Sequence, residues 1–410
     1  MATDTVKETY TFKDKLKALG PGFLIVGSFI GPGTVTSSTR AGAEYGYTLL
    51  WCIVFSVIAV IITQGMAARI GVVTQKGLSE NLVEDFADKP FLKNILVILV
   101  TLAIAIGGFA YMGGDLTGTA IGVSALTGIP THIVAPLWGL CILGILSLPG
   151  ESVKYLEKLL AICVLIMAIV FAVTMVVVKP DLGALAAGFV PVIPDGALMT
   201  CLSLIGTTVV PYNMFLHAAS AQRTWSSAKQ LPLVSFGTTV PMIIGGIVTA
   251  AILVTSGAVM QGMPVRNALD MAVQLEPTLG DFSKPFMAIG LIAAGISSAT
   301  ITPIGVSYVL AGLFGWETHR KDKRFYYTNI AVLITGIVIA AVGFNPIALI
   351  MAAQAVNGIF LPVIVGVVVY LTSKSSIMGE HKNSMLQTIL GILIFAISLY
   401  LGGSSVISLF

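Results

Sequence analysis

The chain of 410 residues is 56% hydrophobic and only 10% charged, with a mean hydropathy of +0.96. Because soluble domains carry about 25% charged residues, this composition excludes an ordinary water-soluble globule, a disordered chain, a nucleic-acid binder and a secreted disulfide scaffold. It predicts a polytopic membrane protein, in which the net charge of +3 matters less than where the charges lie.

Eleven apolar segments approach the roughly 20 residues that a helix needs to cross a bilayer. All should be helices, because lipid offers no partner to free backbone groups. The first 18 residues form a polar tail without the features of a secretory signal. In chain order the segments are Leu19–Ala41, Tyr47–Val72, Phe91–Leu126, Thr131–Leu148, Val153–Val178, Ala197–Ala221, Leu231–Met260, Pro285–Phe314, Tyr327–Phe344, Pro346–Thr372 and Met385–Leu409.

Lysine and arginine are distributed unevenly between the two sets of alternating loops. With a cytoplasmic N-terminus, 18 of the 22 basic residues lie inside, and the other four are Arg40, Lys179, Arg266 and Lys284. Cytoplasmic loops carry such an excess of positive charge. The pattern predicts a cytoplasmic N-terminus and an external C-terminus. It makes the basic run His319–Arg324 an inner anchor and not a nucleic-acid patch.

Two segments contain helix-breaking residues near their middle. The first segment holds Gly31, Pro32 and Gly33, and the sixth holds Gly206 and Pro211. Proline removes a backbone donor, and glycine lowers the cost of unwinding. Unwound backbone survives in a membrane only against protein or a water-filled cavity. Because the breaks are five segments apart, they favour inverted five-helix repeats with a midplane binding site over two tolerated proline kinks.

Oxygen-bearing side chains flank both breaks. Thr34 follows the first break, while Thr207 and Asn213 surround the second. Together with carbonyl oxygens from unwound helix ends, they would form an uncharged cradle suited to Mg²⁺, Ca²⁺, Mn²⁺, Na⁺ or K⁺. The alternative is that Thr34 and Asn213 only cap the broken helix ends. The four cysteines show no metal-ligand spacing, and no resident cofactor is expected.

Four motifs in the same order resemble those of the Nramp family of divalent metal transporters. They are GPGFL at Gly20–Leu24, AGAEYGYTLLW at Ala41–Trp51, GTTVVPYNMFLH at Gly206–His217 and GLIAAGISSA at Gly290–Ala299. Seven of the twelve positions in the third motif are identical to the family pattern GATVMPHNLYLH. The resemblance covers nearly the whole chain.

The resemblance implies an all-α polytopic membrane protein with the LeuT-type fold. Helices 1–5 and 6–10 would form inverted repeats with helices 1 and 6 broken, and an eleventh helix would follow. Residues 1–18 would be a cytoplasmic tail, 19–372 the transport core of ten helices, and 373–410 a cytoplasmic loop with helix 11. The expected mechanism is alternating access.

The chain departs from the family where the metal binds. Relatives bind transition metals with the Asp and Asn of a DPGN motif and the Met of an MPHN motif. Here these motifs are replaced by residues 31–34 (GPGT) and 210–213 (VPYN). The carboxylate is missing at Gly31, a hydroxyl replaces the amide at Thr34, and the thioether is missing at Val210.

These departures favour a harder, more strongly hydrated ion. A thioether discriminates against Mg²⁺ and Ca²⁺, and Val210 removes that discrimination. Mg²⁺ gives up water reluctantly, so a wider neutral pocket would hold it through its waters. The pattern resembles the bacterial Nramp-related magnesium transporters. It predicts uptake chiefly of Mg²⁺, and also of Mn²⁺, across the bacterial plasma membrane, with no obligatory protein partner.

Proton coupling is also expected to be lost. Gly31 cannot titrate, and Tyr212 replaces a histidine of the family motif. The family's third helix reads like TDLAE, whereas residues 114–118 read GDLTG, so the aspartate remains as Asp115 and the glutamate is lost. A two-charge ion moving through 100 mV gains about 4.6 kcal/mol, which would drive uptake without protons.

Further candidate site residues are Asp115, Gln354 and Tyr212. Asp115 is the acidic residue placed well inside a span, with a structural hydrogen bond or ion pair as its alternative role. Gln354 matches a glutamine near the metal in relatives, but it also suits interhelical hydrogen bonding. Tyr212 would line the pocket or pack between helices. His217 is expected to serve gating or packing.

Two other functions remain open. One is a transition-metal transporter of the Nramp type with a rebuilt site, against which Gly31 and Val210 argue. The other is a membrane sensor or receptor that kept the fold and lost transport. An enzyme is not expected, because the sequence contains no recognisable nucleophile–base pair, phosphate loop or metal-hydrolase motif.

Overall fold

Proline and capping side chains set where several helices begin in the computed structural model, which describes residues 10–147, 150–318 and 322–407. The helix Phe12–Phe29 starts at a capping box between Thr11 and Asp14. It therefore begins seven residues before the predicted first span. Proline occupies an N-terminal position in several other helices, where its missing N–H costs nothing.

The long helices account for the predicted segments. They are α1 (Phe12–Phe29), α2 (Pro32–Tyr45), α3 (Leu50–Thr74), α5 (Pro90–Thr127), α6 (Thr131–Ser147), α7 (Gly150–Val177), α9 (Leu198–Thr208), α10 (Pro211–Thr224), α11 (Leu231–Val259), α14 (Ser283–Phe314), α15 (Lys323–Ala341), α16 (Pro346–Ser373) and α18 (Met385–Ile407). Short helices in the connections are α4 (Leu78–Asp85), α8 (Leu182–Ala187), α12 (Ala268–Ala272), α13 (Glu276–Leu279) and α17 (Ser375–Met378).

Each of the eleven predicted segments corresponds to one long helix or one broken pair. Within the described residues, nine helices are long and apolar enough to cross a membrane, and the bent pair α1–α2 makes a tenth. The remaining segment is α6, which at 17 residues is slightly shorter than the others. Residues 1–9 of the predicted tail, 148–149 at the end of the fourth predicted segment, 319–321 of the basic run and 408–410 at the C-terminus lie outside the described residues.

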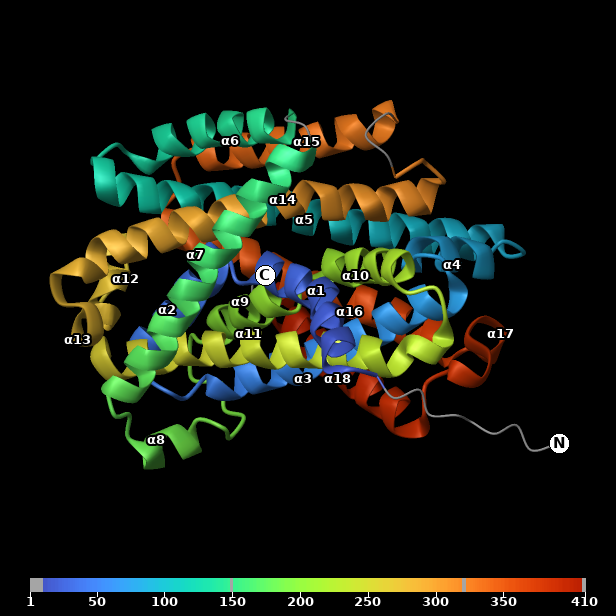
Figure 1. Ribbon diagram of the computed structural model, residues 1–410. Helices are drawn as coiled ribbons and strands as arrows, with labels where there is room; N and C mark the ends of the chain where they lie inside the picture. Colours follow the sequence, from blue (N-terminus) through green and yellow to red (C-terminus); the bar gives the residue numbers. More distant parts are fainter. Residues whose placement is uncertain (1–9, 148–149, 319–321, 408–410) are drawn as a thin grey trace.

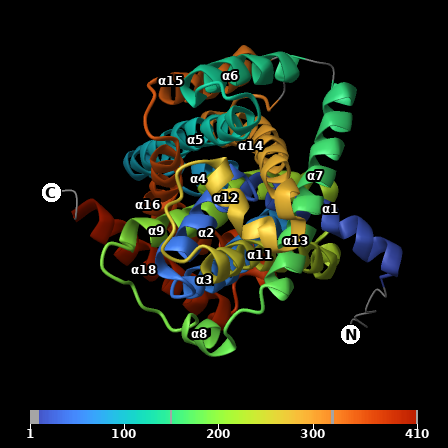
Figure 2. The same cartoon turned by 90° about the vertical axis from the view of Figure 1, so that its left-hand side faces the viewer.

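The helices divide into two packed groups with further helices alongside (Figure 1). In the first group, α5 packs on α6, α14 and α15. In the second, α11 packs on α1, α2 and α3, while α10 packs on α3. Figure 2 shows α6 and α15 stacked above α5 and α14, with α2, α3 and α11 below them. We call these the scaffold group (α5, α6, α14, α15) and the bundle group (α1, α2, α3, α9, α10, α11).

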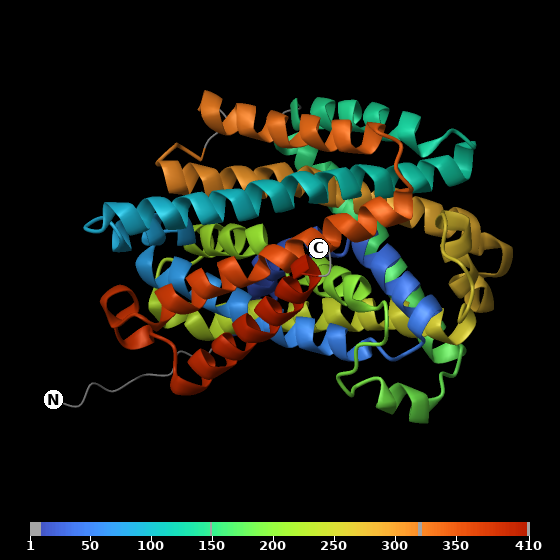
Figure 3. The ribbon, with the colours of Figure 1, turned by 180° about the vertical axis from the view of Figure 1, so that it is seen from behind.

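The helix α16 joins the two groups. It packs against α5 of the scaffold group, against α9 of the bundle group and against α18. Figure 3 shows it running obliquely between them. The bundle group contains both broken pairs, so the breaks face α5, α14 and α16 across the boundary between the groups. Buried side chains from all these elements meet there.

Candidate functional site

The first broken helix is bent by 61° where α1 gives way to α2. Ile30 caps α1, and Gly31 precedes the proline that begins α2. Gly31 has φ −110° and ψ −174°, an extended conformation open to any residue. The backbone therefore does not require glycine at this position, and what glycine provides there is the absence of a side chain.

The space beside Gly31 is occupied by a carboxylate. A Cβ placed on Gly31 would lie 3.3 Å from the Cβ of Ser298 and 3.7 Å from Oδ1 of Asp115. Asp115 comes from α5 and Ser298 from α14. The scaffold group thus directs a carboxylate at the bundle residue where the sequence lacks one.

Hydroxyl groups of α14 hold this carboxylate on one side. Ser298 and Thr302 both donate to Oδ2 of Asp115, at 2.7 and 3.1 Å. The other oxygen, Oδ1, is buried and has no hydrogen-bond partner among the described residues. Because a buried unpaired carboxylate oxygen is costly, this atom is available to bind a cation or its water.

Two carboxamides near the breaks also present unpartnered oxygens. Asn213 donates from Nδ2 to Oγ of Ser28 at 2.6 Å, and its Oδ1 is buried without a partner in the described part of the chain. Both polar atoms of the Gln354 amide are likewise unsatisfied there. The Gln354 side chain lies against Gly33, since a Cβ on that glycine would be 2.1 Å from Nε2.

These groups are linked into one region by short contacts. Ser298 also approaches the carbonyl of Ser28 at 3.2 Å, and Ser28 is the residue that binds Asn213. A Cβ on Gly114 would lie 3.7 Å from Nε2 of Gln354, which places that amide next to the backbone preceding Asp115. We name Asp115, Asn213, Gln354, Ser298 and Thr302 the central polar cluster.

Thr34 and Thr207, which the sequence predicts near the ion, form hydrogen bonds across the breaks. Thr34 donates to the carbonyl of Phe29 in a short contact and lies 2.8 Å from Oγ1 of Thr207. These bonds satisfy a carbonyl at the end of α1 and tie α2 to α9. Within this structure Thr34 and Thr207 therefore brace the breaks, whereas the unpartnered oxygens belong to other residues.

The remaining predicted residues lie around the cluster. Val210 is fully buried and precedes the proline that opens α10. The hydroxyl of Tyr212 lies 2.9 Å from Thr302, and its ring meets Tyr111 edge-on with centroids 5.9 Å apart. His217 pairs with Gln64 of α3 at 3.0 Å, one step away from the cluster.

Sequence reasoning missed the two hydroxyl groups of α14. Ser298 lies at the end of the matched motif GLIAAGISSA, and Thr302 is four residues later on the same helical face. The spacing of four residues indicates that both hydroxyl groups lie on one face of the helix. The sequence does not reveal that this face meets Asp115, because α14 is buried over most of its length and no single face stands out.

The central polar cluster is closed to solvent in this structure. Asp115, Asn213 and Gln354 each have a relative exposure of 0%. On one side, Ser37 of α2 meets Ser203 of α9 at 2.6 Å, and Gln274 donates to Thr39 at 2.8 Å. The structure thus represents a form in which an ion at the cluster would be enclosed.

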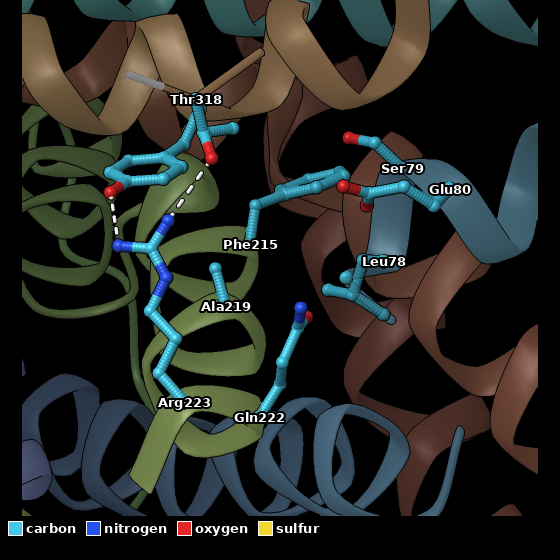
Figure 4. A pocket seen from close by; sticks show the side chains of 10 residues that line it. Leu78, Ser79, Glu80, Phe215, Ala219, Gln222, Arg223 and Thr318 are labelled. Atoms are coloured by element: carbon cyan, nitrogen blue, oxygen red, sulfur yellow. Dashed lines mark hydrogen bonds between the residues drawn. The ribbon is translucent and has the colours of Figure 1, made fainter. Parts of the chain in front are cut away.

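On the other side, the last turn of α10 is hydrogen-bonded to α14 and to the segment that follows it. Arg223 donates to the hydroxyl of Tyr308 at 2.5 Å and to Thr318 at 3.0 Å (Figure 4). A cavity of about 30 Å³, lined by Phe215, Glu80 and these residues, lies beside the contact. We call the contacts of Arg223 with Tyr308 and Thr318 the α10 clasp.

Glu80 faces this cavity from α4. Burial raises the pKa of its carboxyl above the ordinary value of 4.5. A Cβ on Gly312 would lie 2.9 Å from Oε2 of Glu80, so the carboxyl lies directly on α14. The region therefore combines a fixed guanidinium with a carboxyl that burial disfavours in its charged form.

Comparison with known proteins places the chain in a defined family. The model of the family "Natural resistance-associated macrophage protein-like", Nramp, matches residues 22–408. Divalent metal cation transporters named MntH are similar over almost the full length. That of Listeria monocytogenes is 29% identical, covering 98% of this chain and 92% of its own. That of Yersinia pestis is 27% identical, covering 97% and 96%.

Solved structures agree on the fold. A mutant of the manganese transporter of Eremococcus coleocola matches with a TM-score of 0.77 at 23% identity, covering 98% of this chain and 89% of that chain. MhsT matches with a TM-score of 0.58 at 16% identity, covering 95% and 98%. The predicted LeuT-type architecture with a 5+5 repeat and an added helix is confirmed at the level of fold. The chain belongs to the Nramp family.

Proposed function

We propose that this protein is a divalent cation transporter of the bacterial plasma membrane, carrying chiefly Mg²⁺ and also Mn²⁺ by alternating access. The observation that carries the proposal is the central polar cluster. It combines one carboxylate with two amide oxygens, and each has an unpartnered buried oxygen among the described residues. Oxygen donors of this kind suit Mg²⁺ and Mn²⁺.

The donor set favours a hydrated ion over a stripped one. One carboxylate and two amides are fewer than the six ligands that Mg²⁺ requires, and Mg²⁺ usually keeps several waters. Val210 supplies no sulfur at the second break, where a thioether would favour softer metals. The ligand roles proposed are direct or water-mediated contact for Asp115, Asn213 and Gln354, with Gly31 leaving the space.

The arrangement of the helices supports alternating access. Ligand candidates come from both packed groups, because Asp115 lies on α5 and Asn213 on α10. A relative rotation of the groups would open the cluster to one side at a time. The α10 clasp would then be the contact that must break for release to the cytoplasm.

The proposal includes uptake without proton exchange. The membrane potential supplies about 4.6 kcal/mol per 100 mV for a divalent ion, which can sustain accumulation. The N-terminus would be cytoplasmic and the C-terminus external, as the positions of the basic residues indicate. The chain would consist of a cytoplasmic tail (1–18), a transport core of ten helices (19–372) and a cytoplasmic loop with the final helix (373–410).

Transport by reconstituted protein tests the proposal. Liposomes carrying an inside-negative potential are loaded with a Mg²⁺ indicator and a pH dye, and entry of Mg²⁺, Mn²⁺ and Ca²⁺ is followed. Mg²⁺ should enter without acidifying the lumen. Asp115→Asn should slow entry at least about tenfold, since replacing one member of a buried charged network costs several kcal/mol, whereas Asp195→Asn in an exposed turn should not.

The same measurement separates the alternatives. Entry of Mn²⁺ without Mg²⁺ would indicate a transition-metal transporter with a rebuilt site, as the names of the relatives suggest for those proteins. Binding without entry of any ion would indicate a sensor. Mg²⁺ entry accompanied by lumen acidification would contradict the uncoupled mechanism while leaving magnesium transport intact.

A further inference from the structure

A second cavity shares no lining residue with the central polar cluster and is formed by residues of α3, of α11 and of the start of α18. Its volume is about 500 Å³, within the range of small-molecule sites. One wall is apolar and includes Ile61, Ile62 and Val234. The other carries Arg69, His381 and Lys382, and no aspartate or glutamate is among the described residues that line the cavity.

Arg69 is a fixed cation with neutral partners. Its guanidinium donates to Oε1 of Gln387 at 2.9 Å and, in a short contact, to Oδ1 of Asn383. Its Nε is buried and has no hydrogen-bond partner among the described residues. Carboxamides carry no counter-charge, so the arginine is oriented by α18 while its charge stays uncompensated.

Lys382 adds a second uncompensated charge. Its amine binds the hydroxyl of Ser375 at 3.0 Å. Neither Lys382 nor Arg69 forms an ion pair with any residue that the structure describes. His381 approaches Glu380 at 3.6 Å, but that glutamate is 89% exposed and does not line the cavity. The basic wall is therefore complementary to an anion.

We infer that this cavity binds an anionic phospholipid, with its phosphate on Arg69 and Lys382 and an acyl chain along α3 and α11. Arginine and lysine together recognise phosphate oxygens, and basic pockets between membrane helices hold acidic headgroups. The adjoining apolar wall distinguishes a lipid from a free phosphate ion. With the orientation proposed above, the lipid belongs to the cytoplasmic leaflet.

The occupant would bridge two separate elements of the fold. Arg69 belongs to the bundle group, whereas Lys382 precedes α18, which packs against α16. A lipid held by both would connect the bundle group to the last helix at the inner face. This is independent of which ion the central polar cluster carries, so its failure would leave the transport proposal untouched.

Lipid retention and thermal stability test the inference on the purified full-length protein. Native mass spectrometry should show retained phosphatidylglycerol, and added phosphatidylglycerol should raise the melting temperature more than phosphatidylcholine does. Inorganic phosphate serves as the free-anion probe and should give no comparable stabilisation. Equal effects of the two lipids, or full stabilisation by phosphate alone, would overturn the lipid site.

Three variants sharpen the test without touching the α3–α18 tie made by Arg69. Lys382→Gln should weaken phosphatidylglycerol retention about fivefold, because one basic residue near a membrane surface contributes about that factor. Gly65→Leu should reduce retention at least about tenfold by filling the cavity, since no atom of the described residues lies within 4 Å of a Cβ built there. The matched control, Lys89→Gln, removes an exposed charge from the same end and should change retention less than about twofold.

The variants also decide between the lipid and other occupants. If Lys382→Gln and Lys89→Gln weakened retention equally, general surface charge and not the cavity would be responsible, and the inference would be wrong. If Gly65→Leu had no effect while Lys382→Gln did, the site would bind only a small anion, and the lipid assignment would be overturned. Loss of retention in both cavity variants, with normal folding, supports it.

Discussion

The two broken helices perform the same structural task with different local geometry. The α1–α2 pair is bent by 61° at Ile30 and Gly31. Gly31 interrupts the first helix and leaves room beside the Asp115 carboxylate. Two valines, Val209 and Val210, interrupt the second, and the proline that follows starts α10. The first break thus leaves space beside the Asp115 carboxylate, whereas the second is filled by buried valine side chains.

The glycines near the two breaks differ in the same sense. A Cβ on Gly206 in α9 would lie 2.0 Å from the carbonyl oxygen of Gln354, a backbone atom that cannot move aside. A Cβ on Gly31 would meet only ordinary or slightly tight contacts with side chains. Gly206 is therefore required for the packing of α9 on α16. Gly31 is not required for packing, and its effect is to leave the site without a side chain and without a second charge.

The largest expected effect comes from testing this contrast directly. Gly206→Ala should destabilise the protein by about 3 kcal/mol or prevent folding, because the α9–α16 contact must open. Gly31→Ala should cost less than about 1 kcal/mol, since its backbone conformation suits any residue. Melting of the detergent-purified proteins measures both. Equal losses would show that the two breaks are not different in kind.

A carboxylate placed at the first break should alter transport more than folding. In Gly31→Asp the Cβ of the new side chain would lie 3.7 Å from Oδ1 of Asp115. Two carboxylate charges about 4 Å apart repel by about 4 kcal/mol at an effective dielectric constant of 20. A divalent ion would relieve that repulsion and leave slowly. We expect a lower KM and a maximal Mg²⁺ entry rate reduced about tenfold, measured as initial rates in liposomes.

Two variants serve as comparisons for the Gly31→Asp result. Gly31→Asn has similar size without charge, and it should keep a maximal rate within about threefold of the wild type if repulsion is the cause. Gly31→Asp combined with Asp115→Asn restores a single carboxylate and should recover part of the lost rate. An unchanged rate in Gly31→Asp alone would mean that the ion does not pass beside Gly31.

The ends of α2 and α10 extend the comparison to two arginines. Arg40 of α2 binds Glu44 of its own helix at 2.6 Å, whereas Arg223 of α10 is clasped to α14. Charge-assisted hydrogen bonds contribute about 1.5–3 kcal/mol. Arg223→Gln should therefore open the inner side, raising thiol labelling of Ala219→Cys about tenfold in a cysteine-free background.

Arg40→Gln is the matched control for that measurement. Exposed pairs at i and i+4 contribute only about 0.3–0.5 kcal/mol, so labelling of Ala219→Cys should change less than about twofold. If both arginine variants increased labelling equally, the α10 clasp would not be the specific inner closure.

The smallest expected effect concerns the carboxyl beside the clasp. Burial raises the pKa of Glu80 in the folded protein above its value of 4.5, so ionisation of this carboxyl lowers the stability as pH rises from the unfolded-state pKa through the folded-state pKa. Glu80→Gln should raise the melting temperature at about pH 8, and the gain should vanish near pH 4, where both states bind the proton. A gain independent of pH would point to packing instead.

Much of the fold could be predicted from the sequence, but the central polar cluster only in part. Length and hydropathy locate the eleven segments, because lipid demands continuous apolar helices. Proline and glycine locate both breaks, yet they do not reveal how much space lies beside each one. That space depends on whether glycine or valine lies between the helix ends, and on what packs beside them.

The candidate site shows the same limit. Asp115 stands out because a charge inside a span is unusual. That its free oxygen points at Gly31, and that Ser298 and Thr302 hold the other, depends on how α5 and α14 turn their faces. Thr34 illustrates the converse, since its position in the motif suggests a ligand while its hydrogen bonds brace the break.

The contact between Gly206 and Gln354 has a mechanical consequence. A Cβ on Gly206 would lie 2.0 Å from the Gln354 carbonyl oxygen, so the α9 backbone packs directly on α16. Such close packing would resist sliding of α9 along α16 more than rotation about the point of contact. That point is also where the Gln354 side chain reaches Gly33 of α2. The contact at Gly206 would therefore act as a pivot between α9 and α16. The Gln354 amide, which lies at this contact, would move little, while the two ends of the transport path would move further.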